Sequence, residues 1–480
     1  MKTSVKVILI FALFLVLQIR TAVCQEKKYE NAPRVVLGST EEMQTPEFWI
    51  SRIESNPDRV MLTPEQIAAL NKETANLRET VKKMKDINGE SFSVDRVINY
   101  NDVTGAQYKI EDPLAIKSFP GDSLRARLLA HRKFFDSRTY YDHRQMKIDD
   151  FKKNEWYKQT NFDAIPDVIT PKYGITTVHA LNRVLPTHEL ALGRPDEWYI
   201  EGLQSTSADV AMPLAILHES VDNDWYYVRT ETAFGWIDAS TVAIATPEEI
   251  RDYVDADNFI VALAHQIPVY GSKSFDSFIT HLYVGSKFRL IGKTNPGYHV
   301  LVPFRKSDGT LEIVDGWVKP DAKVSVGYQP LTQRNMINTL FNLLYRPYSW
   351  NDSRHEWNCC GFVRVVFRTF GIKTGNWPAF EMHYSNNLVV FPSKTPREKK
   401  YSYLDNCDPG LTLVGSDGHM NVFLGKVDGK PYVIHMGGYD YDLGEDTVMM
   451  YRRVNVNHTE LEGGYNVNDW TKISYLKSVN

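Results

Sequence analysis

The sequence predicts a multidomain protein with a mainly helical N-terminal region, two small β-barrel domains and an α+β domain at the C-terminus. Three observations carry this prediction. The chain has 480 residues, about three times the length of an average domain. Its pattern changes twice, from charged and helical to short aromatic runs, and then to helices followed by strands. A Gly-Trp-aliphatic segment also occurs twice, about eighty residues apart, which indicates an internal repeat.

The composition narrows the class of protein. Hydrophobic residues make up 43% and charged residues 24% of the chain, values typical of a soluble globular protein and not of a disordered or collagen-like one. The formal net charge of −4 lacks the basic excess typical of nucleic-acid-binding proteins. Aromatic residues reach 12%, whereas there are only four cysteines. This combination indicates β-rich units with aromatic cores and excludes a disulfide-bonded scaffold.

Residues 1–24 have the pattern of a secretory signal peptide. Lys2 and Lys6 precede the apolar run 7–17, and Ala22-Val23-Cys24 suits cleavage. The run is shorter than the about 20 residues of a membrane-spanning helix, so a retained anchor is the less favoured alternative. A lipoprotein that begins at Cys24 is a second alternative, although Val23 is a poor residue before a lipidated cysteine. We therefore expect export, to a periplasmic or extracellular location, without stable membrane insertion.

The N-terminal region, residues 25–150, is charged and predicted to be mainly helical. Thr63-Pro64-Glu65-Gln66 has the order of an N-cap, a first-turn proline and an early acid. This order predicts a helix that begins at Pro64.

Residues 151–250 and 251–328 are predicted to form two copies of one small β-module. Short aromatic and β-branched runs separated by Asp, Asn, Gly and Pro are typical of small barrels. In each copy an extended run leads through a turn to a Gly-Trp-aliphatic segment: Trp225-Tyr226-Tyr227-Val228 leads to Gly235-Trp236-Ile237, and Tyr298-His299-Val300-Leu301 leads to Gly316-Trp317-Val318. Two matched pairs are much less expected by chance than one.

Residues 329–480 are predicted to form an α+β domain, because helical segments precede the strands. Residues 335–344 have a helical pattern, a turn with Pro347 follows, and residues 361–370 form a second helix. Strands are expected around 420–424 and 432–435.

Cys359 and Cys360 fall in the first turn of that second helix. Apolar residues lie on one face of it, so the helix packs inward: these are Phe362, Val363, Val366, Phe367 and Phe370. Backbone N–H groups and the positive dipole end at a helix start favour a thiolate. The alternatives are a small core residue and a metal-binding pair, for which His355 is the nearest further ligand.

Two histidines lie on neighbouring predicted strands, joined through the turn signal Asp428-Gly429. A two-residue turn alone places His419 and His435 on opposite faces. A three-residue loop pairs His435 with Asn421 and places both histidines on one face, because side chains repeat every second residue. If the histidines act together, an odd loop or a bulge is required here. A helix-start cysteine with two such histidines favours acyl-transfer catalysis over separate structural roles.

At these residues the sequence resembles the NlpC/P60 family of cell-wall cysteine peptidases, which have a circularly permuted papain-like fold. The match covers most of the C-terminal third, from Gln333 through Arg346-Pro347-Tyr348-Ser349-Trp350, the Cys359 helix, Gly418-His419 and Ile434-His435. Arg183-Val184-Leu185-Pro186-Thr187, followed by the two Gly-Trp segments, is similar to the paired bacterial SH3-like domains of one subgroup. That subgroup also has a helical N-terminal stabilising region.

The resemblance implies a γ-D-glutamyl-L-diamino acid endopeptidase that acts on peptidoglycan stem peptides with a free N-terminal L-Ala. Cys359 is then the nucleophile, His419 the general base and His435 the residue that orients it. Further residues are expected near the oxyanion or the substrate: Tyr348, Cys360 and Asn376. The resemblance implies no metal or cofactor, and we expect a monomer whose partners are peptidoglycan-derived peptides.

The sequence departs from the family pattern at two places. Asn358-Cys359-Cys360-Gly361 stands where the family has Asp-Cys-Ser-Gly, and Asn351-Asp352 stands where it has Gly-Gly. These departures leave a non-catalytic cell-wall-binding protein as the alternative function. A third hypothesis is amide hydrolysis or acyl transfer on another substrate.

Overall fold

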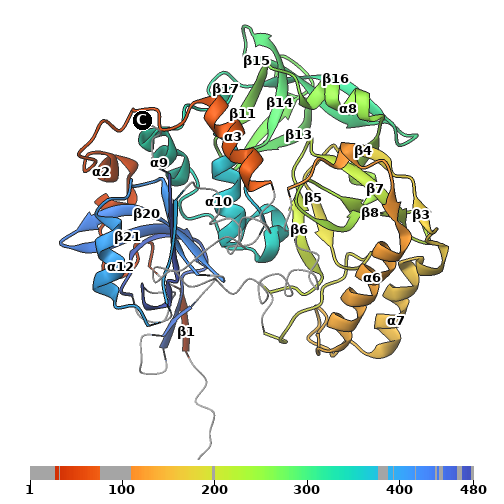
Figure 1. The fold of residues 1–480 in the computed structure, drawn as a ribbon. Helices are drawn as coiled ribbons and strands as arrows, with labels where there is room; N and C mark the ends of the chain where they lie inside the picture. The colour runs from red at the N-terminus through yellow and green to blue at the C-terminus, as the bar shows by residue number, and fades with distance from the viewer. Residues whose placement is uncertain are drawn as a thin grey trace, which may run out of the picture.

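The computed structural model describes residues 28–31, 33–75, 110–196, 200–376, 387–392, 394–416, 418–437, 440–442, 447–461 and 467–476. The predicted signal peptide, with Cys24, lies outside them. None of the helices in these ranges has both the length and the apolar character needed to cross a bilayer. Figure 1 shows three β-rich parts grouped around helix α10 (Cys359–Arg368).

The first sheet has seven strands in the order β10-β4-β7-β8-β9-β5-β6. Their bounds are β4 (Lys172–Thr176), β5 (Ala180–Arg183), β6 (Gln204–Ala208), β7 (Pro213–Glu219), β8 (Trp225–Arg229), β9 (Phe234–Asp238) and β10 (Val242–Ile244). The short helix η4 (Ala239–Thr241) precedes β10. Strand β6 lies at one edge of this sheet, so its outer side is available to contact another part of the chain.

The second sheet has the order β17-β11-β14-β15-β16-β12-β13. Its strands are β11 (Phe259–Ala262), β12 (Gln266–Tyr270), β13 (Phe278–Tyr283), β14 (Lys287–Lys293), β15 (Tyr298–Arg305), β16 (Leu311–Val318) and β17 (Val324–Val326). Taken in chain order, each strand occupies the position of its counterpart in the first sheet. Val228 pairs with Gly235 in one sheet and Val300 with Gly316 in the other, so the two Gly-Trp segments occupy equivalent positions in the two sheets.

Helix α6 (Gly121–Asp136) covers the first of these two sheets. Leu124 and Leu128 of α6 pack into one core with Tyr227 and Trp236 of the sheet. Helix α7 (Asp150–Gln159) lies beside α6, and the predicted boundary at residue 150 falls at its start. Short elements flank these helices, namely η2 (Pro113–Ala115), β2 (Phe119–Pro120), η3 (Phe162–Ala164) and β3 (Val168–Ile169), while α8 (Pro247–Val254) follows the first sheet.

The N-terminal segment packs against the C-terminal domain. Strand β1 (Lys28–Asn31) pairs in parallel with β23 (Thr447–Met450), which also pairs with β22 (Asp440–Asp442). The segment continues through η1 (Glu42–Gln44), α2 (Pro46–Ile50) and α3 (Pro64–Thr74). Trp49 and Leu70 are buried in the same core as α10. Thr63 caps α3 in a capping box with Gln66, so the helix predicted from Pro64 is confirmed.

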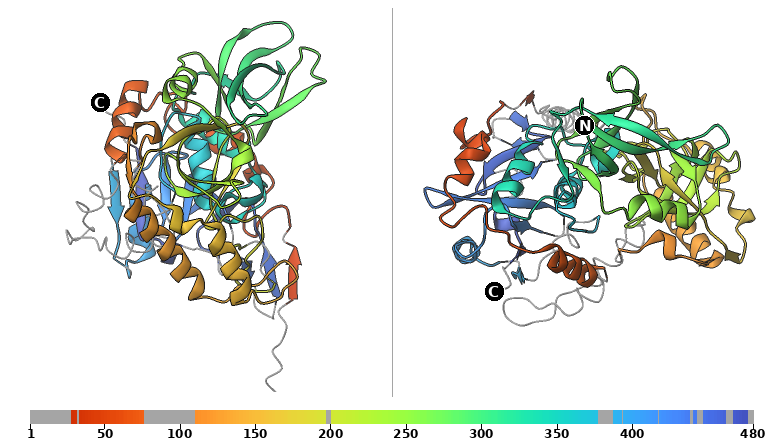
Figure 2. Two further views of the ribbon diagram at one scale, coloured as in Figure 1. Left: turned by 90° about the vertical axis from the view of Figure 1, so that its right-hand side faces the viewer. Right: turned by 90° about the horizontal axis from the view of Figure 1, so that it is seen from above.

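The C-terminal sheet has six strands in the order β18-β25-β19-β20-β21-β24. They are β18 (Asn387–Val390), β19 (Thr412–Gly415), β20 (Met420–Val427), β21 (Lys430–Met436), β24 (Val454–His458) and β25 (Lys472–Tyr475), with η6 (Val467–Asp469) before the last. Helices α9 (Gln333–Phe341) and α10 share a core with Val422 and Ile434, whereas α12 (Arg397–Leu404) packs with Phe423 and Val433 on the other face. The predicted order of helices and strands is confirmed. Seen from above, this sheet and the first sheet lie on opposite sides of the molecule (Figure 2).

Candidate active site

Helix α10 presents two cysteines in its first turn, as predicted. Asn358 is the N-cap, and its Oδ1 accepts a hydrogen bond of 2.9 Å from the Gly361 N–H. Cys359 is 7% exposed and Cys360 2% exposed. Neither forms a disulfide, and their Sγ atoms lie 3.8 Å apart. Both thiols therefore sit where unpaired N–H groups and the helix dipole favour negative charge.

The β20–β21 hairpin places both histidines on one face. Asp428 and Gly429 form a two-residue turn with φ angles of 50° and 77°, so the three-residue loop is wrong. A bulge lies between Phe423 and Gly425 and shifts the register by one residue. Val422 consequently pairs with Ile434, and Asn421 and His435 come next in the ladder. The sequence required an odd loop or a bulge if the histidines act together, and the structure has the bulge.

The contacts of His419 fix which of its nitrogens carries the proton. Its Nε2 lies 2.9 Å from His435 Nδ1 and 3.1 Å from Asn421 Oδ1. Asn421 Nδ2 donates to the Val414 carbonyl at 3.2 Å, so the Asn421 oxygen faces the imidazole. An oxygen acceptor requires a donor, which places the proton on His419 Nε2. Nδ1 is then left as the basic nitrogen, and the imidazole hydrogen-bonds the Cys359 thiol.

The surroundings of Cys359 favour its thiolate. The hydrogen bond from Cys360 contributes most to lowering the pKa of Cys359 well below its usual value. Burial opposes this effect, and the charge and hydrogen bond of His419 and the Met420 N–H reinforce it. A thiolate held by two donors and a nearby imidazole is the arrangement that activates cysteine nucleophiles.

His435 is suited to hold His419 without taking a proton itself. It is 4% exposed on β21. Burial lowers the pKa of His435 to about 3, the charge of His419 adds to the effect, and the Asn457 side chain opposes it. His435 therefore stays neutral near neutral pH, and its Nδ1 accepts the Nε2 proton of His419.

Of the remaining predicted residues, Tyr348 and Cys360 lie near Cys359, whereas Asn376 lies at the contact with the first sheet. Tyr348 pairs through its backbone with Trp357, two residues before Cys359, and its ring packs against the core that contains the thiol. Cys360 contacts Cys359 directly. Asn376 accepts a hydrogen bond of 2.8 Å from Arg364 and donates to the Thr232 carbonyl of the first sheet at 3.4 Å. Its amide thus lies in the interface between two domains, and substrate contact by Asn376 stays a prediction.

Asn421 is the residue that sequence reasoning missed as part of the site. It lies two positions after His419, on the same face of β20, and it fixes the tautomer of the imidazole. Period-two spacing from His419 was the signal that pointed to it. The metal alternative gains no support in the described ranges, which hold no group of three or more His, Cys, Asp or Glu side chains suited to a metal ion.

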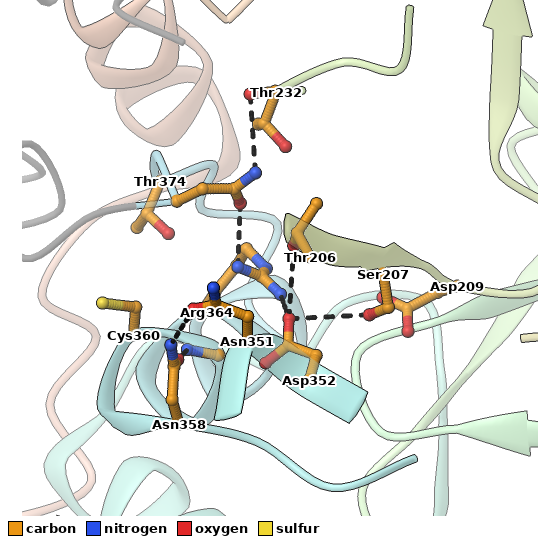
Figure 3. A network of polar contacts seen from close by, with 12 residues as sticks. Thr206, Ser207, Asp209, Thr232, Asn351, Asp352, Asn358, Cys360, Arg364 and Thr374 are labelled. Carbon is orange, nitrogen blue, oxygen red and sulfur yellow. Dashed lines mark hydrogen bonds and ion pairs between the residues drawn. The ribbon is translucent and has the colours of Figure 1, made fainter. Parts of the chain in front are cut away.

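The loop before α10, η5 (Trp350–His355), is bound by the edge strand β6 of the first sheet (Figure 3). Asp352 is 1% exposed and pairs with Arg364 of α10. Its Oδ2 also accepts hydrogen bonds from Thr206 and Ser207 of β6 at 3.4 and 3.5 Å. A Cβ at Gly361 would lie 2.1 Å from Asp352 Oδ1, so glycine is needed there. The first sheet thus reaches the helix that carries Cys359.

A cavity of about 510 Å³ lies at the far end of α10, lined by Arg368, Gly371 and Lys373 together with residues of both β-modules. Cys359 and Arg368 stand at the two ends of the helix, nine positions apart, a distance of about 13.5 Å at 1.5 Å per residue. This cavity is therefore separate from the thiol.

Comparisons with known proteins agree with this architecture. Residues 195–238 match the family model of an SH3 domain of the SH3b1 type. The structure is similar to that of an NlpC/P60 endopeptidase from Photobacterium damselae subsp. piscicida, with a TM-score of 0.68, 14% sequence identity, and coverage of 94% of this chain and 100% of that chain. An NlpC/P60 family protein from Bacillus cereus ATCC 10987 aligns with 63% of this chain and 98% of its own, at 15% identity and a TM-score of 0.44. No curated protein sequence matches the chain.

At this identity, the likeness to the endopeptidase concerns the fold, and it extends over nearly the whole chain. The SH3 match includes β6, the strand that contacts the loop before Cys359. The resemblance inferred from the sequence is confirmed: this chain has the fold of an NlpC/P60 endopeptidase and contains an SH3 domain of the SH3b1 type.

Proposed function

We propose that the protein is an exported cysteine endopeptidase that hydrolyses the bond between γ-D-Glu and the diamino acid of peptidoglycan stem peptides. The alignment of Cys359, His419 and His435 carries this proposal. His419 contacts the thiol on one side, and its Nε2 lies 2.9 Å from His435 Nδ1 on the other. A nucleophile, a base and a residue that orients the base are the parts that acyl transfer requires.

The reaction follows from these contacts. His419 Nδ1 takes the thiol proton, and the Cys359 thiolate attacks the γ-amide carbonyl carbon. Backbone N–H groups at the start of α10 stabilise the oxyanion. As the C–N bond breaks, His419 returns the proton to the leaving amine of the diamino acid and a thioester remains. Water, deprotonated by His419, then hydrolyses the thioester and restores the thiol.

The proposed layout is a papain-like catalytic domain with two SH3-like domains, residues 151–250 and 251–328, the second as a copy of the first. Their identical strand order supports this. In the resembled subgroup, the first SH3-like domain narrows the cleft and selects peptides with a free N-terminal L-Ala. The contact of β6 with η5 puts the first sheet beside the helix that carries Cys359, which supports the same selection here.

The predicted signal peptide and the SH3 match support a periplasmic or extracellular location. Peptidoglycan-derived peptides are the proposed partners, and a monomer suffices because Cys359, His419 and His435 come from one chain.

Cleavage of the tripeptide L-Ala-γ-D-Glu-meso-diaminopimelate, followed by mass spectrometry, tests the proposal. The expected products are L-Ala-D-Glu and free diaminopimelate. The N-acetylated tripeptide is the matched control for recognition of the free amine, and it should react much more slowly. If the protein cleaves no tripeptide but still sediments with purified peptidoglycan, the proposed peptidase activity is wrong. That result would favour the non-catalytic cell-wall-binding protein.

A further inference from the structure

We propose that Asn351 is a positioning residue for Cys359, because it joins the edge strand β6 of the first sheet to the N-cap of α10. The inference rests on the proposed function, since it takes Cys359 as the nucleophile. It concerns the two places where the sequence departs from the family pattern, at Asn351-Asp352 and at Asn358.

Three hydrogen bonds hold Asn351. Its Nδ2 donates to the Gln204 carbonyl of β6 at 3.0 Å, and its own carbonyl accepts from Gln204 Nε2 at 3.1 Å. Its Oδ1 accepts from Asn358 Nδ2 at 3.0 Å. The backbone of Asn351 is left-handed, with φ 46° and ψ 44°, a conformation that asparagine and glycine adopt most readily.

These contacts fix the direction of each amide. Arg183 donates to Gln204 Oε1 at 3.3 Å, which directs Gln204 Nε2 to the loop. The donation from Asn351 Nδ2 leaves its Oδ1 towards Asn358. Asn358 must then present its NH2 group to Asn351 and its oxygen to the Gly361 N–H. The chain of contacts thus runs from Gln204 of the first sheet to the first turn of the helix that begins at Cys359. Figure 3 shows Asn351 and Asn358 within it.

The chain of contacts explains why an asparagine replaces the aspartate of the family pattern at position 358. An aspartate at position 358 would place a carboxylate oxygen against Asn351 Oδ1. Both oxygens are acceptors, and neither carries a proton to donate. Asn351 cannot turn its amide without losing its bond to Gln204. The negative charge near the helix start is supplied by Asp352 instead, which pairs with Arg364. The departures at 351, 352 and 358 therefore form one compensated set.

The test uses the full-length protein and the variants Asn351→Gly, Asn358→Asp and Asn351→Gly/Asn358→Asp. Glycine keeps the left-handed backbone, so Asn351→Gly removes only the side-chain contacts. Asn223→Gly is the matched control. Asn223 is exposed, has φ 62° and lies in the turn between β7 and β8, away from η5. The measurements are the pH profile of Cys359 alkylation by iodoacetamide, read by mass spectrometry, and kcat and KM for the tripeptide.

Loss of the Asn351 contact should slow alkylation at neutral pH by about two- to fivefold, the range for one helix-terminus contact, and shift the profile to higher pH. Asn358→Asp should slow it by about tenfold, because its carboxylate would face the acceptor Asn351 Oδ1 without a proton between them. Glycine at 351 removes that oxygen and should restore part of the loss. Asn223→Gly should behave as wild type. kcat should fall with alkylation while KM changes little.

A wild-type alkylation profile in Asn351→Gly, or effects of the two substitutions that simply add, would overturn the role of Asn351. Alkylation does not depend on peptide hydrolysis. If the variants change alkylation as expected but the wild type cleaves no tripeptide, the positioning role stands and the proposed function fails.

Discussion

The first and second sheets have the same strand order, and their equivalent edge strands, β6 and β13, approach the same loop, η5, in different ways. Strand β6, with the sequence Gln-Ser-Thr-Ser-Ala, binds Asn351 and Asp352 through hydrogen bonds. Strand β13 is aromatic, and its Tyr283 ring stacks with His355 at a centroid distance of 5.9 Å. One topology thus supplies two kinds of contact, and the side chains of the edge strand decide which one.

The two contacts differ in energy because β6 binds a carboxylate that is also paired with Arg364 of α10, whereas β13 contributes a ring contact. Asp352 and Arg364 have side chains that are 2% and 5% exposed, so removal of either charge breaks this ion pair in the interior. A ring contact that is lost can be replaced in part by other apolar atoms or by water. We therefore expect the β6 side to be intolerant of substitution and the β13 side to be tolerant.

The largest effect is expected for Asp352→Asn, which keeps the shape but leaves the Arg364 charge without its partner. The free energy of unfolding should fall by about 3 kcal/mol, the usual cost of breaking a buried pair from one side. Urea denaturation followed by tryptophan fluorescence measures it. The control is Asp58→Asn in the exposed pair with Arg334, which should leave the denaturation midpoint unchanged; equal midpoints for all three proteins would contradict the difference between the two edges.

An intermediate effect is expected from acid, and it should come from the β13 side. Burial lowers the pKa of His265 and of His355 to about 4, against about 6.5 in an unfolded chain. Between pH 4 and pH 6.5 these histidines bind protons in the unfolded state but not in the folded state. Their contribution to the free energy of unfolding is therefore fully present above pH 6.5 and is lost as the pH falls towards 4.

Urea midpoints between pH 7 and pH 4.5 measure this loss. His355→Asn should flatten the pH dependence, whereas Asp352→Asn should lower stability by a similar amount at each pH. A pH dependence that is unchanged in His355→Asn would show that this cluster of histidines does not contribute.

The smallest effect is expected for Tyr283→Leu. Its ring contacts His355 and His179, at 5.9 and 5.0 Å between centroids, and such pairs contribute about 0.5–1.5 kcal/mol beyond burial. The melting temperature should fall slightly, with little change in the rate of Cys359 alkylation. Tyr283→Phe keeps the ring and should match the wild type; a loss in Tyr283→Leu as large as in Asp352→Asn would erase the difference between the two edges.

Local pattern was sufficient to predict individual elements. The cap at Thr63, the cysteines in the first turn of a helix, and the odd loop or bulge between the two histidines each depend on residues a few positions apart. The repeat of the Gly-Trp segment likewise predicted that Gly235 and Gly316 occupy equivalent positions in two sheets, because repeated segments usually belong to copies of one structural unit.

Contacts between distant residues could not be predicted in the same way. Gln204 and Asn351 are 147 positions apart, and nothing in either segment alone indicates the other. The cover of α6 over the first sheet and the pairing of β1 with β23 are also long-range. Asn351 and Asn358 were visible as departures from a family pattern, but that one fits the other became clear only from the hydrogen bond that joins them.

We propose that Cys359, and not its neighbour Cys360, is the nucleophile that His419 activates. Tripeptide cleavage by Cys359→Ala and Cys360→Ser tests it most directly, with circular dichroism to verify that both variants fold. Cys359→Ala should show no cleavage, because the thiol that contacts His419 is gone. Cys360→Ser should keep most of the activity, because a hydroxyl can still donate to the thiolate. Full activity in Cys359→Ala, or its complete loss in Cys360→Ser alone, would contradict the assignment.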